Sequence, residues 1–204
     1  MGQDYIAYLA LKNKKNGFYI DIGANDGKTF SNTYIFEQLG WDGICVEANP
    51  NTFKKLQENR KCHMYNCAVV LNSTGTAKFI TSSVSGLDTL EMFDADYQKA
   101  KRTSIGINET EVIEVKTMTF NDIMKDFKDI TYIDFMSLDI EGGEVDVLNS
   151  IDFNKYSFGL LTIEFSGHTY EPIMNIMKNN GYKLLVINSC DLMFIKDKKD
   201  QLTI

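Results

Sequence analysis

Long apolar runs, proline and basic residues are all scarce in this 204-residue chain. Two prolines and fourteen glycines argue against a disordered chain, and no internal repeat is visible. No stretch approaches the roughly 18 apolar residues of a membrane helix, and residues 1–15 lack the apolar segment of a signal peptide. We therefore expect a soluble, cytoplasmic protein whose single domain spans residues 1–204.

Positive charge and cysteine pairs are also lacking. The chain has 21 Lys and Arg against 28 Asp and Glu, and its net charge is −7. Because phosphate binding depends on clustered Lys and Arg, neither a nucleic acid nor an anionic membrane is an expected partner. The four cysteines form no Cys-x-x-Cys pair and lie in apolar runs, so we expect buried thiols rather than disulfides or zinc ligands.

The chain does contain a regular alternation of short apolar runs and amphipathic segments. Strands are predicted at residues 17–22, 43–47, 62–70, 132–140, 158–165, 182–187 and 192–196. Helices are predicted at residues 31–39, from residue 50, and at 144–148 and 171–180. The first three strands and their helices open a parallel sheet with right-handed crossovers, and the last two strands form a hairpin. This order predicts an α/β fold, a doubly wound and mostly parallel seven-stranded sheet with a terminal antiparallel hairpin.

The middle of the chain, residues 72–119, is less regular. Short strands are predicted at 76–80 and 112–118 and one helix near 94–101, but residues 82–108 lack a clear period and are rich in Ser, Asp, Gly and Thr. Long irregular segments inside a compact domain are often functional. We therefore expect residues 72–119 to form an irregular insert or lid over the binding site.

Ligands of such sheets bind beyond the carboxyl ends of the strands, so the residues that follow each strand are candidates for the site. Residues 21–27 (DIGANDG) follow the first strand. Gly23 permits a sharp turn and the close approach of a ligand, and Gly27 relieves crowding where the helix begins. The third glycine of a G-x-G-x-x-G loop is missing, which disfavours a dinucleotide. An ordinary strand-to-helix turn is the alternative.

The second and third strands are followed by Glu47 and Asn66. Glu47 lies twenty residues after Gly27, and a carboxylate there can accept hydrogen bonds from both hydroxyls of a ribose. A surface Glu that caps the next helix is the alternative. Asn66 offers an amide that can border an adenine ring, although a packed strand end accounts for it equally well.

Acidic residues gather after the fourth and fifth strands. Asp139 and Glu141 alternate along an extended chain and therefore point to one face. Two carboxylates beside an apolar core are costly unless they are paired or bound to a ligand. Glu144 can instead cap the following helix. Glu164 and His168 follow the next strand, and His168 is either a helix-start residue or a base.

These motifs, in this order and spacing, resemble the FkbM family of S-adenosylmethionine-dependent O-methyltransferases. The similarity lies in residues 18–27, 46–50 and 138–144, of which the last fits the family pattern D-x-E-G-x-E, and it extends over residues 17–196. The resemblance implies the Rossmann-like fold of class I methyltransferases and S-adenosylmethionine as the cofactor. It also places the lid on the acceptor side.

By the same resemblance, Asp21, Gly23 and Glu47 help to hold the methyl donor, and Asp139 lies beside its methionine end. The remaining residues of the predicted donor site are Asn25, Gly27 and Asn66. The resemblance does not identify the acceptor. By analogy alone, we expect a hydroxyl of a small molecule, a sugar or a glycan.

The sulfonium methyl is already activated, so the protein has to align an acceptor hydroxyl with the S–CH3 bond and remove its proton. The candidate bases are Asp139, Glu141, Glu164 and His168, and we prefer His168 because histidine titrates near neutral pH. In a second version, a divalent cation such as Mg²⁺ on Asp139 and nearby carboxylates acidifies the hydroxyl. Two other classes remain open: a nucleotide-sugar or NAD enzyme, and a non-catalytic protein that binds the donor or a partner.

Overall fold

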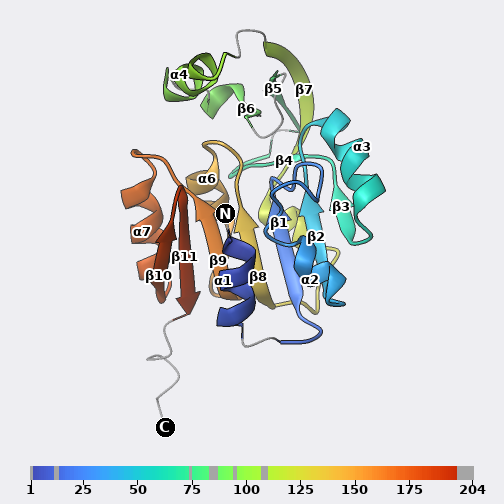
Figure 1. Cartoon of the computed structure of the whole chain (residues 1–204), viewed down its shortest axis with the longest axis vertical. Helices are drawn as coiled ribbons and strands as arrows, with labels where there is room; N and C mark the ends of the chain where they lie inside the picture. Colours follow the sequence, from blue (N-terminus) through green and yellow to red (C-terminus); the bar gives the residue numbers. More distant parts are fainter. Residues whose placement is uncertain are drawn as a thin grey trace.

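The computed structural model describes residues 2–11, 14–73, 75–82, 87–93, 96–106 and 110–196. Seven strands form its main sheet in the order β10-β11-β9-β8-β1-β2-β3 (Figure 1). They are β1 (Phe18–Ile22), β2 (Asp42–Val46), β3 (His63–Tyr65), β8 (Tyr132–Leu138), β9 (Ser157–Glu164), β10 (Tyr182–Asn188) and β11 (Asp191–Lys196). β3, β2, β1, β8 and β9 run parallel, and β11 is antiparallel to both β9 and β10. The predicted sheet and its terminal hairpin are confirmed.

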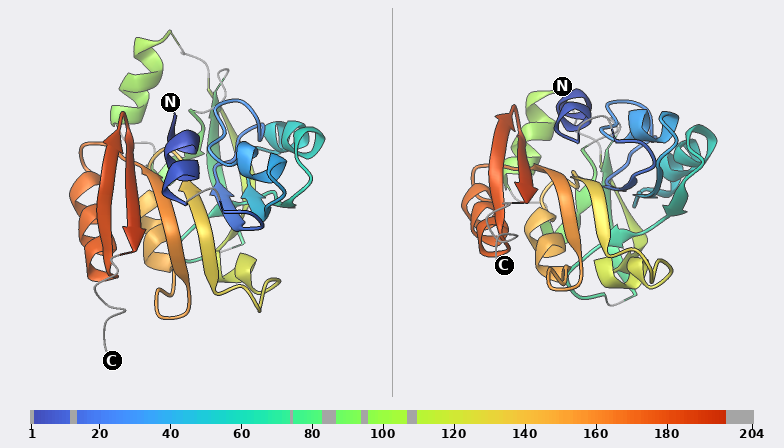
Figure 2. Two further views of the ribbon diagram at one scale, coloured as in Figure 1. Left: turned by 60° about the horizontal axis from the view of Figure 1, so that its bottom comes forward. Right: turned by 90° about the horizontal axis from the view of Figure 1, so that it is seen from below.

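Helices cover both faces of this sheet (Figures 1 and 2). One face carries α1 (Gln3–Ala10), α2 (Tyr34–Gln38) and α3 (Pro50–Asn59), and the other carries α5 (Phe120–Met124), α6 (Glu144–Ser150) and α7 (Tyr170–Asn179). Every residue of β1 is buried, as expected for a parallel strand covered on both sides. None of the described helices is long and apolar enough to cross a membrane.

Each face of the sheet has its own apolar core. Phe120 of α5 packs against Phe158 of β9 in one core, and Phe36 of α2 packs against Phe135 of β8 in the other. Both cores fill the space between strands and helices with large buried aromatic side chains. The carboxyl ends of the strands are therefore held on a rigid frame.

A second, four-stranded sheet stands over the carboxyl edge of the main sheet in Figure 1. Its order is β4-β7-β5-β6, and the elements of this part are β4 (Ala68–Val69), β5 (Thr76–Ser82), β6 (Thr89–Leu90), the 3-10 helix η1 (Glu91–Phe93), α4 (Asp96–Ser104) and β7 (Thr110–Met118). The strands predicted at residues 76–80 and 112–118 correspond to β5 and β7, and the helix predicted near 94–101 overlaps α4. The role of residues 72–119 as a lid stays a prediction. β5 and β7 pair residues that are 28 to 40 positions apart, from 82 with 110 to 76 with 116. Residues 74, 83–86, 94–95 and 107–109 of the predicted lid lie outside the described residues.

The predicted third strand, residues 62–70, is divided between the two sheets. β3 pairs with β2 in the main sheet, whereas β4 pairs with β7 in the second sheet. The chain leaves the main sheet at Asn66, whose side-chain amide donates hydrogen bonds to the carbonyl oxygens of Glu47 (2.8 Å) and Ala48 (3.1 Å). Asn66 therefore fixes the turn after β2 and directs the chain toward the second sheet.

Candidate active site

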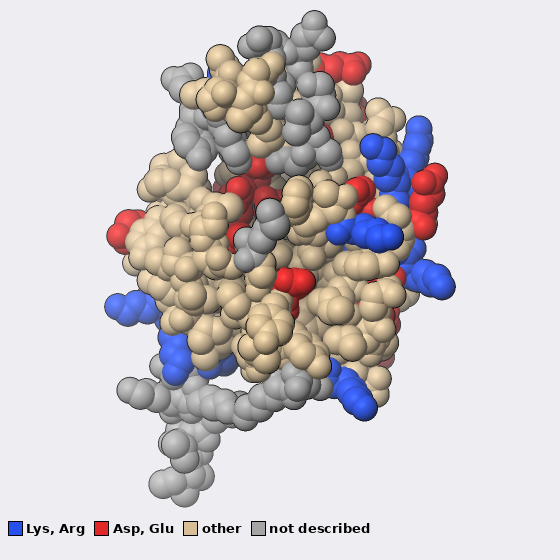
Figure 3. All heavy atoms as spheres, viewed as in Figure 1, with Lys and Arg blue, Asp and Glu red and all other residues tan. Residues whose placement is uncertain are grey.

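A cavity of about 350 Å³ lies where the carboxyl ends of β1, β2 and β8 meet the second sheet. The loop after β1 forms one side of it, and Phe79, Leu90 and Phe93 from the second-sheet side form an apolar wall opposite. In Figure 3 acidic atoms gather in the hollow between the two sheets. The strand order reverses between β1 and β8, which is where ligands bind in open α/β sheets.

The loop after β1 joins all three strands of this edge. Gly23 has a φ of +87°, and a Cβ at this position would lie 1.7 Å from the carbonyl oxygen of Asp139. The N–H groups of Gly23 and Ala24 both donate to the carbonyl oxygen of Val46, at 3.0 Å. Only glycine permits this approach of β1, β2 and β8, since any side chain would overlap the backbone of β8.

Asn25 connects the same loop to the carboxylate that follows β2. Its backbone, at φ +53°, is in the left-handed region, and its N–H donates to Glu47 Oε2 at 2.9 Å. The N–H of Asn49 donates to Glu47 Oε1 at 2.7 Å. Glu47 does not cap α3, because Asn49 does so by accepting from Asn51 N at 2.9 Å. The capping alternative for Glu47 is therefore excluded, and its carboxylate lies in the cavity wall.

A second carboxylate, that of Asp88, lies near Glu47 in the cavity wall. Asp88 accepts hydrogen bonds from Asn49 Nδ2 and Ser82 N, both at 2.7 Å. Burial raises the pKa of Glu47 from its ordinary value of 4.5 to about 7, and the charge of Asp88 adds to the rise. Asp88 lies between predicted elements, and no motif or periodicity in the sequence marks it as a site residue.

Asp21 is buried at the end of β1 and lines the cavity. Its carboxylate accepts hydrogen bonds from the hydroxyls of Thr33 (2.5 Å) and Ser31 (3.4 Å). Burial raises the pKa of Asp21, and the Arg60 guanidinium opposes that rise. The predicted helix 31–39 begins only at Tyr34, because Ser31 and Thr33 lie in the loop that holds Asp21.

Arg60 packs against the loop after β1 and fixes it through hydrogen bonds. Its fully buried side chain donates to Glu37 (2.6 Å), to the hydroxyl of Tyr19 (2.8 Å) and to the carbonyl oxygen of Gly27 (2.9 Å). A Cβ on Gly27, whose φ is +77°, would lie 2.6 Å from Arg60 Cγ. Gly27 is absent from the cavity lining, and its role in the structure is to leave room for the side chains of Leu56 and Arg60.

Replacing Arg60 with methionine is expected to lower the free energy of unfolding by roughly 3–5 kcal/mol, because the partly buried carboxylate of Glu37 and the buried carboxylate of Asp21 lose their cation. Urea denaturation measures the change. Lys61→Met is the matched control, since the neighbouring Lys61 is exposed and its loss should cost less than about 0.5 kcal/mol. Equal losses for both variants would contradict this role of Arg60.

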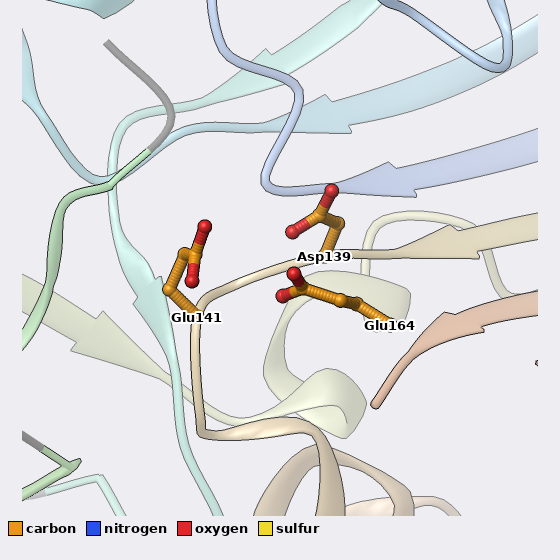
Figure 4. A group of neighbouring side chains, drawn as sticks. All are labelled: Asp139, Glu141 and Glu164. Carbon is orange, nitrogen blue, oxygen red and sulfur yellow. The ribbon is translucent and has the colours of Figure 1, made fainter. Parts of the chain in front are cut away.

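Three carboxylates meet at the ends of β8 and β9. One oxygen from each of Asp139, Glu141 and Glu164 lies within 4.8 Å of the others. Figure 4 shows the carboxylates of Asp139 and Glu164 facing each other, with that of Glu141 across the same space. Asp139 is exposed although it follows a buried strand, since its open surface faces the cavity. Glu141 is buried and has a φ of +57°.

Asp139 and Glu164 form a hydrogen-bonded acid pair. Burial raises the pKa of both groups, and the Asp139 charge raises that of Glu164 further, whereas the hydrogen bond from Glu164 partly offsets the rise at Asp139. Because the pKa of Asp139 is raised to about 7 and that of Glu164 is raised further, Asp139 is the first of the pair to ionise and Glu164 keeps its proton. Such oxygen ligands also suit Mg²⁺, but a cation would have to displace the proton of Glu164. Glu144 caps the turn before α6 by accepting from Ile140 N and Gly142 N, both at 3.1 Å.

The structure brings six of the predicted residues to one cavity and leaves four outside its lining. Those that line it are Asp21, Gly23, Asn25, Glu47, Asp139 and Glu141. Those that do not are Gly27, Asn66, Glu164 and His168. The roles proposed for the six residues in donor binding and proton transfer stay predictions.

His168 is exposed, in the turn after β9. Its Nδ1 lies 3.0 Å from Ser166 Oγ, and Thr169 N donates to the carbonyl oxygen of Ser166 at 3.1 Å. This local turn leaves His168 outside the cavity lining, so its position does not support the preference for it as the base. Asn66, expected beside an adenine ring, uses its amide on the turn after β2 instead.

The strand order, the helices on both faces and the cavity at the point of reversal define the class I methyltransferase fold. Aeropyrum pernix fibrillarin, solved with natively bound S-adenosyl-L-methionine, is similar over 95% of this chain and 72% of its own, at 11% identity and a TM-score of 0.50. An FkbM methyltransferase from Methylobacillus flagellatus KT is similar over 88% of this chain and 43% of its own, at 13% identity and a TM-score of 0.49. At these identities the likeness is one of fold.

The sequence itself matches the methyltransferase FkbM domain over residues 21–184. No curated protein matches it. The chain belongs to the FkbM methyltransferase family, as the motifs predicted. Family and fold together support an S-adenosylmethionine-dependent methyltransferase.

Proposed function

We propose that the protein transfers the methyl group of S-adenosylmethionine to a hydroxyl oxygen of a small molecule or carbohydrate. The observation that carries this proposal is the hydrogen bond from Asn25 N to Glu47 Oε2. This bond holds the loop after β1 and Glu47 together at the wall of the same cavity. The acid pair of Asp139 and Glu164 lies beside them, at the ends of β8 and β9. A donor with adenosyl and amino-acid ends suits such a cavity.

The donor lies along the strand ends in this proposal. Glu47 accepts hydrogen bonds from the ribose hydroxyls, and the apolar side chains of Val69, Phe79 and Leu87 border the adenine ring. Asp139, the member of the acid pair that ionises first, faces the cationic methionine end, which attracts the ionised form. Gly23 lets the donor approach the backbone closely.

Glu141 is the base in this proposal. It lines the cavity between Asp139 and the second sheet, where the Thr89 hydroxyl donates to its carbonyl oxygen at 2.9 Å. The acceptor oxygen attacks the methyl carbon, the C–S bond breaks, and its electron pair passes to sulfur, which leaves S-adenosylhomocysteine. The acceptor's proton passes to the Glu141 carboxylate. Because Asp139 is hydrogen-bonded to the protonated Glu164, it is better suited to binding the donor than to acting as the base.

Replacing Glu141 with glutamine is expected to lower kcat roughly 100- to 1,000-fold, because the acceptor loses its base. The affinity for S-adenosylmethionine should change less than about threefold, since the base contacts the acceptor and not the donor. The measurement is transfer of labelled methyl to sugars, glycans and small alcohols, with donor affinity from calorimetry. Glu171→Gln, an exposed change on α7, is the matched control.

Near-normal kcat in Glu141→Gln would contradict the assignment of the base. A chelator distinguishes proton removal by Glu141 from the version with a cation on the acid cluster. An unchanged rate in EDTA favours proton removal, and loss of activity that Mg²⁺ restores favours the cation. Donor binding without transfer to any hydroxyl compound would favour the non-catalytic alternative.

A further inference from the structure

We infer that the acceptor is a neutral or amine-bearing hydroxyl compound, and that acceptors carrying phosphate, carboxylate or a nucleotide are rejected. This inference rests on the proposed function, because it concerns the second substrate of the same cavity. It follows from the charge of the cavity wall and from the hydrogen bonds that already engage Arg60 and the start of α3.

The wall of the cavity is acidic. Among the residues that the structure describes, its lining contains no Lys, Arg or His. It does contain five carboxylates, those of Asp21, Glu47, Asp88, Asp139 and Glu141. In Figure 3 acidic atoms lie in the hollow, whereas both acidic and basic atoms lie on the outer margins. Sites that take phosphate or carboxylate groups normally offer Arg or Lys.

Arg60, the buried cation next to the cavity, already makes hydrogen bonds within the protein. Arg60 lies under the loop after β1, but its guanidinium donates to Glu37, to Tyr19 and to the carbonyl oxygen of Gly27. An acceptor anion would have to break these buried bonds to reach it, at the cost of an unpaired Glu37. Arg60 therefore offers no anion site to the cavity.

The start of α3, another possible anion site, is engaged as well. The N–H of Asn51 donates to the side chain of Asn49. In the turn before α6, the N–H groups of Ile140 and Gly142 donate to the carboxylate of Glu144. These N–H groups are therefore not available to an acceptor phosphate.

The donor does not neutralise this wall. S-adenosylmethionine carries a sulfonium and an ammonium against one carboxylate, a net charge of about +1. If Asp21, Glu47 and Asp139, whose pKa values are all raised by burial, took up protons, the carboxylates of Asp88 and Glu141 would still face it. Each ionised carboxylate about 8 Å from an acceptor phosphate weakens its binding by roughly 30-fold at the effective dielectric of a protein. A neutral hydroxyl compound meets no such repulsion.

Acceptors that are built on the same hexose and differ in charge test the inference. A panel of hexoses is offered with labelled S-adenosylmethionine, each as the free sugar, the amino sugar, the 6-phosphate and the uronic acid. We expect kcat/KM for the neutral and amino forms to exceed that for the anionic forms by roughly tenfold or more, and the gap to narrow at high salt. Asp88→Asn should lower the ratio of kcat/KM between neutral and anionic acceptors several-fold, because the cavity wall loses one negative charge. The control Glu171→Gln should leave this ratio unchanged.

Calorimetric measurement of S-adenosylmethionine binding distinguishes failure of the proposed function from failure of the inference about the acceptor. If the donor binds, equal or faster transfer to an anionic member overturns the inference, and so does failure to methylate any neutral or amino member. An unchanged preference in Asp88→Asn would also count against it, since the wall charge would then not set the preference. If the donor does not bind, the proposed function fails, and the inference falls with it.

Discussion

Replacing Gly23 with alanine is expected to lower the affinity for S-adenosylmethionine at least roughly 100-fold, measured by isothermal titration calorimetry. The new Cβ would lie 1.7 Å from the carbonyl oxygen of Asp139, and the φ of +87° disfavours any L side chain. The loop after β1 must therefore move away from β8. This movement also breaks the hydrogen bond from Asn25 N to Glu47, so the loop and Glu47 no longer form one donor site.

Gly40→Ala is the matched control for this change. Gly40 has nearly the same φ, +84°, but a Cβ there would meet no heavy atom within 4 Å. Both variants carry similar backbone strain, and only Gly23→Ala adds the overlap with β8. We expect Gly40→Ala to lose about 1 kcal/mol of stability and to bind the donor normally. Normal donor binding by Gly23→Ala would place the donor elsewhere.

Replacing Glu47 with glutamine is expected to weaken donor binding roughly 10- to 100-fold at pH 8, since hydrogen bonds to a charged acceptor are lost. In the wild type, burial raises the pKa of Glu47 to about 7. Because the ionised form accepts hydroxyl hydrogen bonds and attracts a cationic donor, wild-type affinity should rise as the pH increases from 6 to 8. The glutamine variant should lose most of that rise.

The stability of the unliganded protein should change in the opposite direction. A carboxyl whose pKa is raised on folding, here from 4.5 to about 7, stabilises the fold fully only below its unfolded pKa. That contribution is lost as the pH rises from 4.5 through 7. Thermal unfolding measured from pH 5 to 8 should show this decline in the wild type and a smaller one in Glu47→Gln.

Glu58→Gln serves as the control for both measurements, because Glu58 is exposed on α3. It should keep wild-type donor affinity and the wild-type pH dependence. A wild-type pH dependence in Glu47→Gln would mean that another group governs the titration. Unchanged donor affinity in that variant would remove Glu47 from the donor site.

The main sheet and one edge of the cavity can be predicted from the sequence because their signals are local. Each strand is a short apolar run, and the turns after three of them carry Gly23, Glu47 and Asp139. The carboxyl ends of parallel strands meet at one edge, so topology alone places these residues together. The cavity lining agrees with that expectation.

The rest of the site depends on contacts between segments far apart in the chain. Asp88 reaches the cavity because β5 pairs with β7 across a gap of 28 to 40 residues, which no local period records. Arg60 reaches the loop after β1 only through the packing of α3. His168 was preferred for its chemistry, yet a turn closed by Thr169 and Ser166 leaves it exposed. Chemical suitability is visible in a sequence, whereas side-chain direction after a strand is not.

A crystal structure of the protein with S-adenosylmethionine bound would test the central claim most directly. We predict that both ribose hydroxyls lie within hydrogen-bonding distance of the Glu47 carboxylate, that the donor runs past Gly23, and that its methyl group opens toward Glu141. A donor bound away from Glu47, or with its methyl group turned from the acid cluster, would contradict the account.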